Sequence, residues 1–104
     1  MSDVSVESLD WSPWLDFENS GLSSVPESPG VYKMHAGMKI LYIGSSNNLK
    51  ESLQLSLSDP CINQAKRFSY ALTSLQDKMK DQLLLDYRSK HADKLPACME
   101  KDKG

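Results

Sequence analysis

The feature that most constrains the fold is a pair of short β-prone segments joined by a glycine-containing turn. Residues 31–34 and 39–44 are rich in Val, Ile, Leu and Tyr, which favour strands. The four residues between them include Gly37, at a position suited to a positive φ. A connection this short joins antiparallel neighbours, so we predict a β-hairpin with His35 exposed to solvent in its turn.

Helical and extended patterns alternate after the hairpin. Leucines spaced four apart predict a helix that begins near Asn48 and ends before Pro60. Residues 67–73 are the third strand candidate, and a second helix is predicted from a capping box at residues 74–77 to about residue 91. Its apolar side is expected to comprise Leu75, Met79, Leu83, Leu84, Leu85 and Tyr87. The order of hairpin, helix, strand and helix predicts an α+β fold, in which helices flank a three-stranded, largely antiparallel sheet.

The composition is that of an ordinary globular domain with an uneven distribution of charge. With 39% hydrophobic and 25% charged residues, the chain is neither disordered nor fibrous. Residues 1–30 contain six acidic residues and no basic ones, whereas residues 31–104 contain all 12 basic residues and eight acidic ones. The net charge of −2 therefore hides a mildly basic body, which is compatible with a polyanionic partner.

The chain divides into an acidic leader over residues 1–25, a domain over residues 26–99 and a charged tail over residues 100–104. Three aromatic rings lie close together in the leader: Trp11, Trp14 and Phe17. These rings either cover a flank of the domain core or dock a protein partner, and both interpretations stay open.

Two cysteines, Cys61 and Cys98, are too few for a disulfide scaffold and lack the CxxC spacing of a zinc site. We expect both to pack as thiols in a reducing cytoplasm. No apolar run approaches the ~20 residues that a membrane-spanning helix needs, and the N-terminus has no basic region followed by an apolar stretch. The sequence thus predicts a cytoplasmic protein with no membrane partner.

Two motifs in the predicted hairpin resemble the signature of the GIY-YIG nuclease family. The motifs are Gly30-Val31-Tyr32 and Tyr42-Ile43-Gly44. Ser28-Pro29 before the first motif, and an Asn-Leu helix start after the second, extend the resemblance to about residues 26–99. The resemblance implies a nuclease that cuts nucleic-acid backbones with Mg²⁺ or Mn²⁺ as cofactor.

The resemblance also implies catalytic positions for Tyr32, Tyr42 and Gly44. Family members place two tyrosines near the scissile phosphate and an Arg on the first helix, where it offsets charge in the transition state. Here Ser52 occupies the position of that Arg. Its helical neighbours at positions 48, 49, 55 and 56 carry no positive charge. Loss of a charge-stabilising group of this kind costs a factor of ~100 or more in rate.

The family also uses a metal-binding Glu on a later helix, and this chain has no Glu between Glu51 and Glu100. Asp81 and Asp86 are the candidate metal ligands, and the resemblance does not decide between them. Because Asp is one methylene shorter than Glu, such a site would need a closer approach of the backbone. Where many members carry an Asn at the end of the domain, this chain has Met99.

Three classes of function follow. We predict first a nuclease-fold domain that binds nucleic acid, DNA before RNA, with cleavage weak or lost because of Ser52. Its candidate phosphate-binding cations are Lys33, Lys50 and Arg67. The first alternative is an active, divalent-metal-dependent endonuclease that takes its cation and carboxylate from other positions. The second is a protein-interaction module that docks through the leader aromatics.

Overall fold

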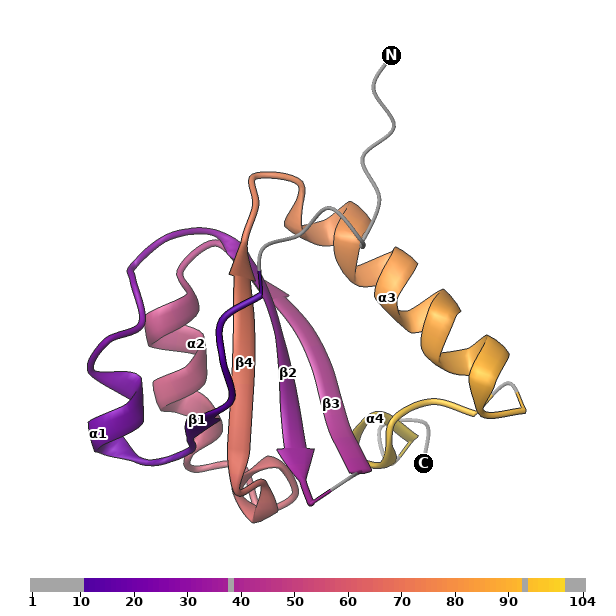
Figure 1. Ribbon diagram of the computed structural model, residues 1–104, viewed down its shortest axis with the longest axis horizontal. Coiled ribbons are helices and arrows are strands. Elements are labelled where there is room, and N and C mark those ends of the chain that lie inside the picture. The colour runs from indigo at the N-terminus through magenta and orange to yellow at the C-terminus, as the bar shows by residue number, and fades with distance from the viewer. Residues whose placement is uncertain (1–10, 38, 93, 101–104) are drawn as a thin grey trace.

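A computed structural model describes residues 11–37, 39–92 and 94–100 of the chain. Residues 1–10 of the predicted leader and residues 101–104 of the predicted tail lie outside this part. The described residues form an α+β fold in which helices pack against one antiparallel sheet (Figure 1). None of the helices in this part is long and apolar enough to cross a membrane.

The sheet has four strands in the order β1-β4-β2-β3, and every neighbouring pair is antiparallel. The strands are β1 (Leu15–Asp16), β2 (Gly30–Ala36), β3 (Lys39–Ser46) and β4 (Arg67–Leu72). The α+β prediction is confirmed, but its three strands were one too few. The added strand, β1, has only two residues, which is too short to show an alternating pattern in the sequence.

Five helical segments complete the described part of the fold. They are α1 (Asn19–Leu22), α2 (Leu49–Ser56), the 3-10 helix η2 (Ile62–Gln64), α3 (Gln76–Lys90) and α4 (Ala97–Glu100). The Asn48 side chain caps α2 by accepting a hydrogen bond from the N–H of Glu51 at 3.1 Å. At the start of α3 the predicted capping box is wrong, since Leu75 occupies the N-cap position with no side-chain cap. The Thr73 hydroxyl accepts the N–H of Leu75 instead.

The predicted hairpin is confirmed in β2 and β3, and Gly37 in its turn has a positive φ of 64°. His35 lies in β2 rather than in the turn and is only 5% exposed, which corrects the expectation of a solvent-exposed ring. Its ring stacks on that of Trp14 with centroids 4.0 Å apart, and its Nε2 lies 3.4 Å from Ser69 Oγ. The leader therefore covers a histidine that the sequence assigned to solvent.

Successive side chains of a strand point to opposite faces, and each face of this sheet has its own apolar cluster. The tyrosine face, against which α2 packs, includes the buried residues Tyr32, Met34, Leu49, Leu53 and Phe68. The α3 face includes Val31, Ile43, Ala71, Met79 and Leu83. Figure 1 shows α2 and α3 on either side of the strands.

Only part of the predicted apolar side of α3 is buried. Met79 and Leu83 lie in the core, whereas Leu75 is 41% and Leu85 63% exposed. Leu75 precedes the helix, and Leu85 points ~200° around the helix from Leu83. Neither side chain therefore faces the sheet.

The second half of the predicted leader contributes to both clusters. Phe17, Leu22 and Val25 are buried on the tyrosine face. Trp11 packs partly against the α3 face, and Trp14 remains 51% exposed. These contacts tie the residues before β2 to the rest of the fold.

Cys61 and Cys98 form a disulfide, which corrects the expectation of two thiols. Their Cα atoms lie 5.7 Å apart although 37 positions separate them in the sequence. Cys61 directly precedes η2 and Cys98 lies in α4, so the bond joins the edge of the sheet at β3 to the segment after α2.

Removal of this disulfide should lower the stability of the fold. Closing a loop of 37 residues removes chain entropy from the unfolded state worth about 4 kcal/mol. We expect the double variant Cys61→Ala/Cys98→Ala to lose about that much free energy of unfolding in urea without reductant. The wild type in dithiothreitol, which keeps both side chains, is the matched control and should lose a similar amount. Losses below about 1 kcal/mol in both samples would contradict the pairing.

Candidate functional site

Tyr32 and Tyr42 lie side by side on the tyrosine face, with ring centroids 6.0 Å apart. Gly44 is paired with Tyr32 across the hairpin and makes room for both rings. A Cβ atom at Gly44 would lie 2.5 Å from Tyr32 Cζ and 2.7 Å from Tyr42 Cε2, closer than Cβ atoms come to other atoms. The glycine of the second motif is therefore a packing requirement of the two tyrosines.

The Tyr32 side chain is 5% exposed and hydrogen-bonds Ser56 and Tyr42. Burial raises the pKa of its hydroxyl above the ordinary value of 10.0, and the neighbouring Tyr42 raises it further. The hydrogen bond to Ser56 lowers this pKa, but burial has the larger effect. Tyr32 is therefore a neutral hydroxyl at neutral pH.

Ser52 in α2 lies against Ser46 at the end of β3, and their hydroxyl oxygens are 2.5 Å apart. Ser46 Oγ also accepts the N–H of Asn48 at 2.9 Å. One hydroxyl hydrogen lies between the two oxygens, and either serine could be the donor. One turn further along α2, the Ser56 hydroxyl, a partner of Tyr32, donates to the backbone carbonyl oxygen of Ser52 at 2.9 Å. The position of the family Arg is thus part of a neutral hydroxyl network.

The three predicted nucleic-acid-binding cations make their contacts elsewhere. Arg67 Nε pairs with Asp16 Oδ1 at 2.8 Å at the junction of β4 and β1. Lys50 Nζ lies 3.5 Å from a backbone carbonyl oxygen of the segment before β2. Lys33 is on the α3 face, with Nζ 4.6 Å from the centre of the Trp11 ring. The structure does not gather these cations around the tyrosine pair.

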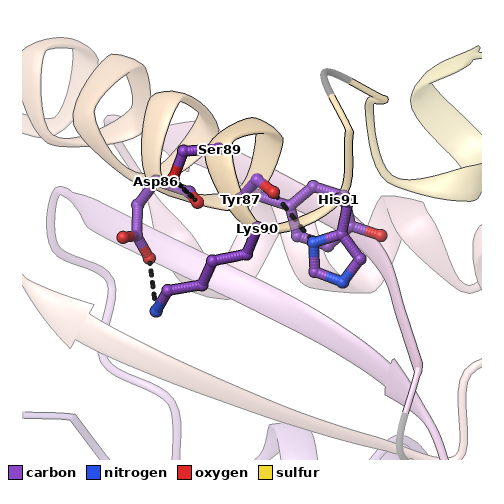
Figure 2. Close-up of polar contacts among 5 residues, drawn as sticks. All are labelled: Asp86, Tyr87, Ser89, Lys90 and His91. Carbon is purple, nitrogen blue, oxygen red and sulfur yellow. Dashed lines mark hydrogen bonds and ion pairs between the residues drawn. The ribbon is translucent and has the colours of Figure 1, made fainter.

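The predicted metal ligands Asp81 and Asp86 lie on α3, which packs against the other face of the sheet. Asp86 forms an ion pair with Lys90 at 3.3 Å, drawn in Figure 2, and interacts electrostatically with Lys33. Asp81 is exposed. Within the part of the chain that the structure describes, no group of three or more His, Cys, Asp or Glu side chains could hold a metal ion.

The side chains around Tyr32 are also a poor ligand set for Mg²⁺. Its hydrogen-bond partners are the hydroxyls of Tyr42 and Ser56, whereas Mg²⁺ is bound in proteins chiefly through carboxylates. Neither predicted carboxylate is brought to this face. The described residues of the tyrosine face therefore do not fit a divalent cation.

Solved structures of a bacterial endonuclease domain share this architecture. The N-terminal GIY-YIG endonuclease domain of UvrC from Thermotoga maritima, a tyrosine-to-phenylalanine mutant bound to the catalytic divalent cation, has a TM-score of 0.60 and 18% identity. The match covers 76% of this chain and 90% of that chain. A second such mutant gives a TM-score of 0.56, and the domain with magnesium gives 0.57, both with 19% identity over 76% of this chain and 90% or 91% of theirs. This chain has a GIY-YIG-like fold.

The recognition of the family signature in the sequence is thus confirmed at the level of the fold. At 18–19% identity, the likeness establishes the architecture alone. No protein-family model matches the sequence, and no curated protein is similar to it.

Two further hydroxyls on the tyrosine face of this GIY-YIG-like domain were not predicted from the sequence. Ser46 lies two residues after Gly44, so strand alternation places it on the tyrosine face. Ser56 lies four residues after Ser52, so helical spacing places both on one side of α2. Both spacings are visible in the sequence. They indicate that the hydroxyls share one site only when α2 is known to pack against β3.

Met99 stands where the family resemblance has an Asn. It lies in α4 and packs partly against the α3 face. Its apolar side chain therefore serves the core of the domain.

A methyl group at Gly44 should disrupt the tyrosine pair. We expect Gly44→Ala to lower the free energy of unfolding by about 1–3 kcal/mol, because the added Cβ overlaps both rings. Thermal and urea unfolding would measure this. The matched control is Gly37→Asn, where the positive φ suits Asn and no atom lies within 4 Å of the added Cβ. Equal effects of the two substitutions would show that Gly44 is not packed as described.

Proposed function

We propose that this GIY-YIG-like domain binds nucleic acid, DNA before RNA, and that its cleavage of phosphodiesters is weak or lost. The observation that carries the proposal is the hydroxyl pair of Ser46 and Ser52, which lies where the family resemblance calls for an arginine. The fold shared with an endonuclease domain supports nucleic acid as the class of partner.

Neutral hydroxyls suit the binding of a phosphate better than its cleavage. Hydroxyls such as those of Ser46 and Ser52 are hydrogen-bond donors of the kind that phosphate oxygens accept. Cleavage adds negative charge in the transition state, which a cation offsets far better than a hydroxyl does. We therefore assign Tyr32, Tyr42, Gly44 and Ser52 to a phosphate-binding site of nuclease descent.

Affinity for the backbone would come from cations outside the tyrosine pair. Lys50 lies on α2, the helix of Ser52, and Arg67 is exposed at the start of β4, where it pairs with Asp16. Exposed cations of this kind bind phosphates without sequence preference, and such binding weakens as salt is raised.

The first alternative is an active endonuclease that uses Mg²⁺ or Mn²⁺. It would need Asp81 or Asp86 as metal ligand and a cation from another position. The related UvrC domain is bound to a catalytic divalent cation, which supports this class of chemistry for the fold. The placement of α3 on the other face counts against it for this chain.

The second alternative is a protein-interaction module. Trp14 is 51% exposed although it stacks on the buried His35, and large exposed rings are common anchors of protein interfaces. Phe17 is part of the core and would not take part.

The test of the proposal is a comparison of binding and nicking. The wild type should bind a short DNA duplex at low salt and leave supercoiled plasmid intact in Mg²⁺ or Mn²⁺. Ser52→Arg restores the family cation, and because the tyrosine face lacks metal ligands among the described residues, we expect it to tighten duplex binding at low salt without gaining metal-dependent nicking. Ser52→Gln is the matched control, because it adds a long polar side chain without charge, and it should gain nothing.

Two results would overturn the proposal. Rapid metal-dependent nicking by the wild type that Tyr32→Phe abolishes would establish the active endonuclease. Undetectable binding to DNA and RNA at low salt would favour the protein-interaction module, since phosphate contacts are strongest there.

A cytoplasmic location is part of the proposal, the Cys61–Cys98 disulfide of the structure counts against it, and the state of the two cysteines in cells tests it. A reducing compartment keeps cysteines as thiols, whereas an oxidising one keeps the disulfide. Alkylation of freshly lysed cells without reductant should therefore label both residues, and mass spectrometry would count the labels. Purified, air-oxidised protein is the control and should remain unlabelled. A disulfide that survives in cells would contradict the cytoplasmic location.

A further inference from the structure

A second candidate site lies on the α3 face, away from the tyrosines. Two adjoining cavities of about 480 and 160 Å³ lie between the C-terminal half of α3 and the start of β3. Both are lined by Ile40, Tyr87 and His91. We call this feature the α3 groove.

The α3 groove has an apolar floor and a fixed aromatic ring at its edge. Ile40, Ile43 and Leu83 line the floor. His91 is exposed, yet its ring stacks on Tyr87 with centroids 3.8 Å apart and planes 9° apart. Its Nδ1 also lies 2.8 Å from the Tyr87 carbonyl oxygen, a second interaction that holds the ring in place (Figure 2). A ring held this way is a platform on which another planar group can stack.

Positive charge surrounds this platform. Lys39 lines the larger cavity, and Lys33 and Lys90 line the smaller one. Asp86 is the one carboxylate among these lining residues, and its ion pair with Lys90 is visible in Figure 2. Because Lys33 and Lys90 share that single carboxylate, an anion placed between them would be favoured.

An apolar floor, a stacking ring and unbalanced cations are the features of single-strand nucleic-acid grooves. A duplex keeps its bases stacked on one another, so only an unpaired base could reach Ile40 and His91. We propose that the α3 groove binds a single-stranded nucleic-acid segment, with one base stacked at His91 and the flanking phosphates at Lys39 and Lys90. The inference rests on the proposed function for the class of ligand, but it places this strand on the face opposite the tyrosines.

Fluorescence anisotropy with a short oligo(dT) and with a blunt DNA duplex tests the α3 groove. We expect Lys39→Gln/Lys90→Gln to weaken oligo(dT) binding about tenfold. The slope of log affinity against log salt concentration should become shallower by about one for each lysine replaced. His91→Ala should weaken oligo(dT) binding about fivefold while duplex binding stays unchanged. All three side chains are exposed, so the variants should fold, and thermal unfolding would verify this.

A charge-matched control separates the groove from the overall charge. Lys66→Gln/Lys78→Gln removes two exposed lysines that do not line the groove, and it should change oligo(dT) binding less than about twofold. If the groove variants bind oligo(dT) as this control does, the proposal that the α3 groove binds a single strand is wrong, while the proposed function stands. If the wild type binds no nucleic acid at all, the proposed function fails as well.

Crosslinking gives an independent readout of position. An oligonucleotide with 5-iodouracil should attach under ultraviolet light to Tyr87 or His91, identified by peptide mass spectrometry. Attachment confined to Tyr32, Tyr42 or Tyr70 would place single strands on the tyrosine face and overturn the groove.

Discussion

The pairing of β2 on both of its edges is the constraint on which the rest of the structure depends. β2 is hydrogen-bonded to β3 and to β4, so its side chains must alternate between two covered faces. A single step along the chain, from Val31 to Tyr32, separates the α3 face from the tyrosine face. A register shift of one residue would exchange the two faces and place Tyr32 beneath α3. This alternation is why the carboxylates of α3 and the tyrosine pair, which the family resemblance assigns to one site, lie on different faces.

On the tyrosine face, close packing and electrical neutrality depend on one another. Gly44 lets two rings approach closely, and burial raises the pKa of Tyr32 still further above neutral pH. Ser52 is short enough to pair with Ser46, so both hydroxyls have a hydrogen-bond partner within the protein when no ligand is bound. An arginine at position 52 would place a charge beside buried hydroxyls with no carboxylate to balance it, which is costly until an anion arrives. The serine thus removes an uncompensated charge from the fold, at the expense of the group that a phosphodiesterase needs most.

Local patterns predicted most of the fold, whereas the exceptions depend on contacts between distant segments. The hairpin, its glycine turn and the leucine spacing of α2 each appear within about ten residues, and all three were predicted correctly. His35 was assigned to solvent because Trp14, which covers it, lies far away in the sequence. The pairing of Cys61 with Cys98 likewise needs α4 to pack at the edge of β3. For the site, the motifs located the tyrosines and the glycine, but the hydroxyl network needed the placement of α2 against β3.

The division of charge along the sequence acquires a different meaning in three dimensions. In the sequence, the leader is acidic and the body is basic, which treats the two segments as separate. The structure instead pairs Asp16 of the leader with Arg67 of the body at 2.8 Å. Both side chains are more than half exposed, so the pair adds little stability, yet it occupies a cation that would otherwise face a polyanion. Lys33 and Lys90, by contrast, share one carboxylate on the α3 face. Two cations therefore face one carboxylate beside α3, whereas the tyrosine face, which carries the family motifs, presents neutral hydroxyls around Ser52.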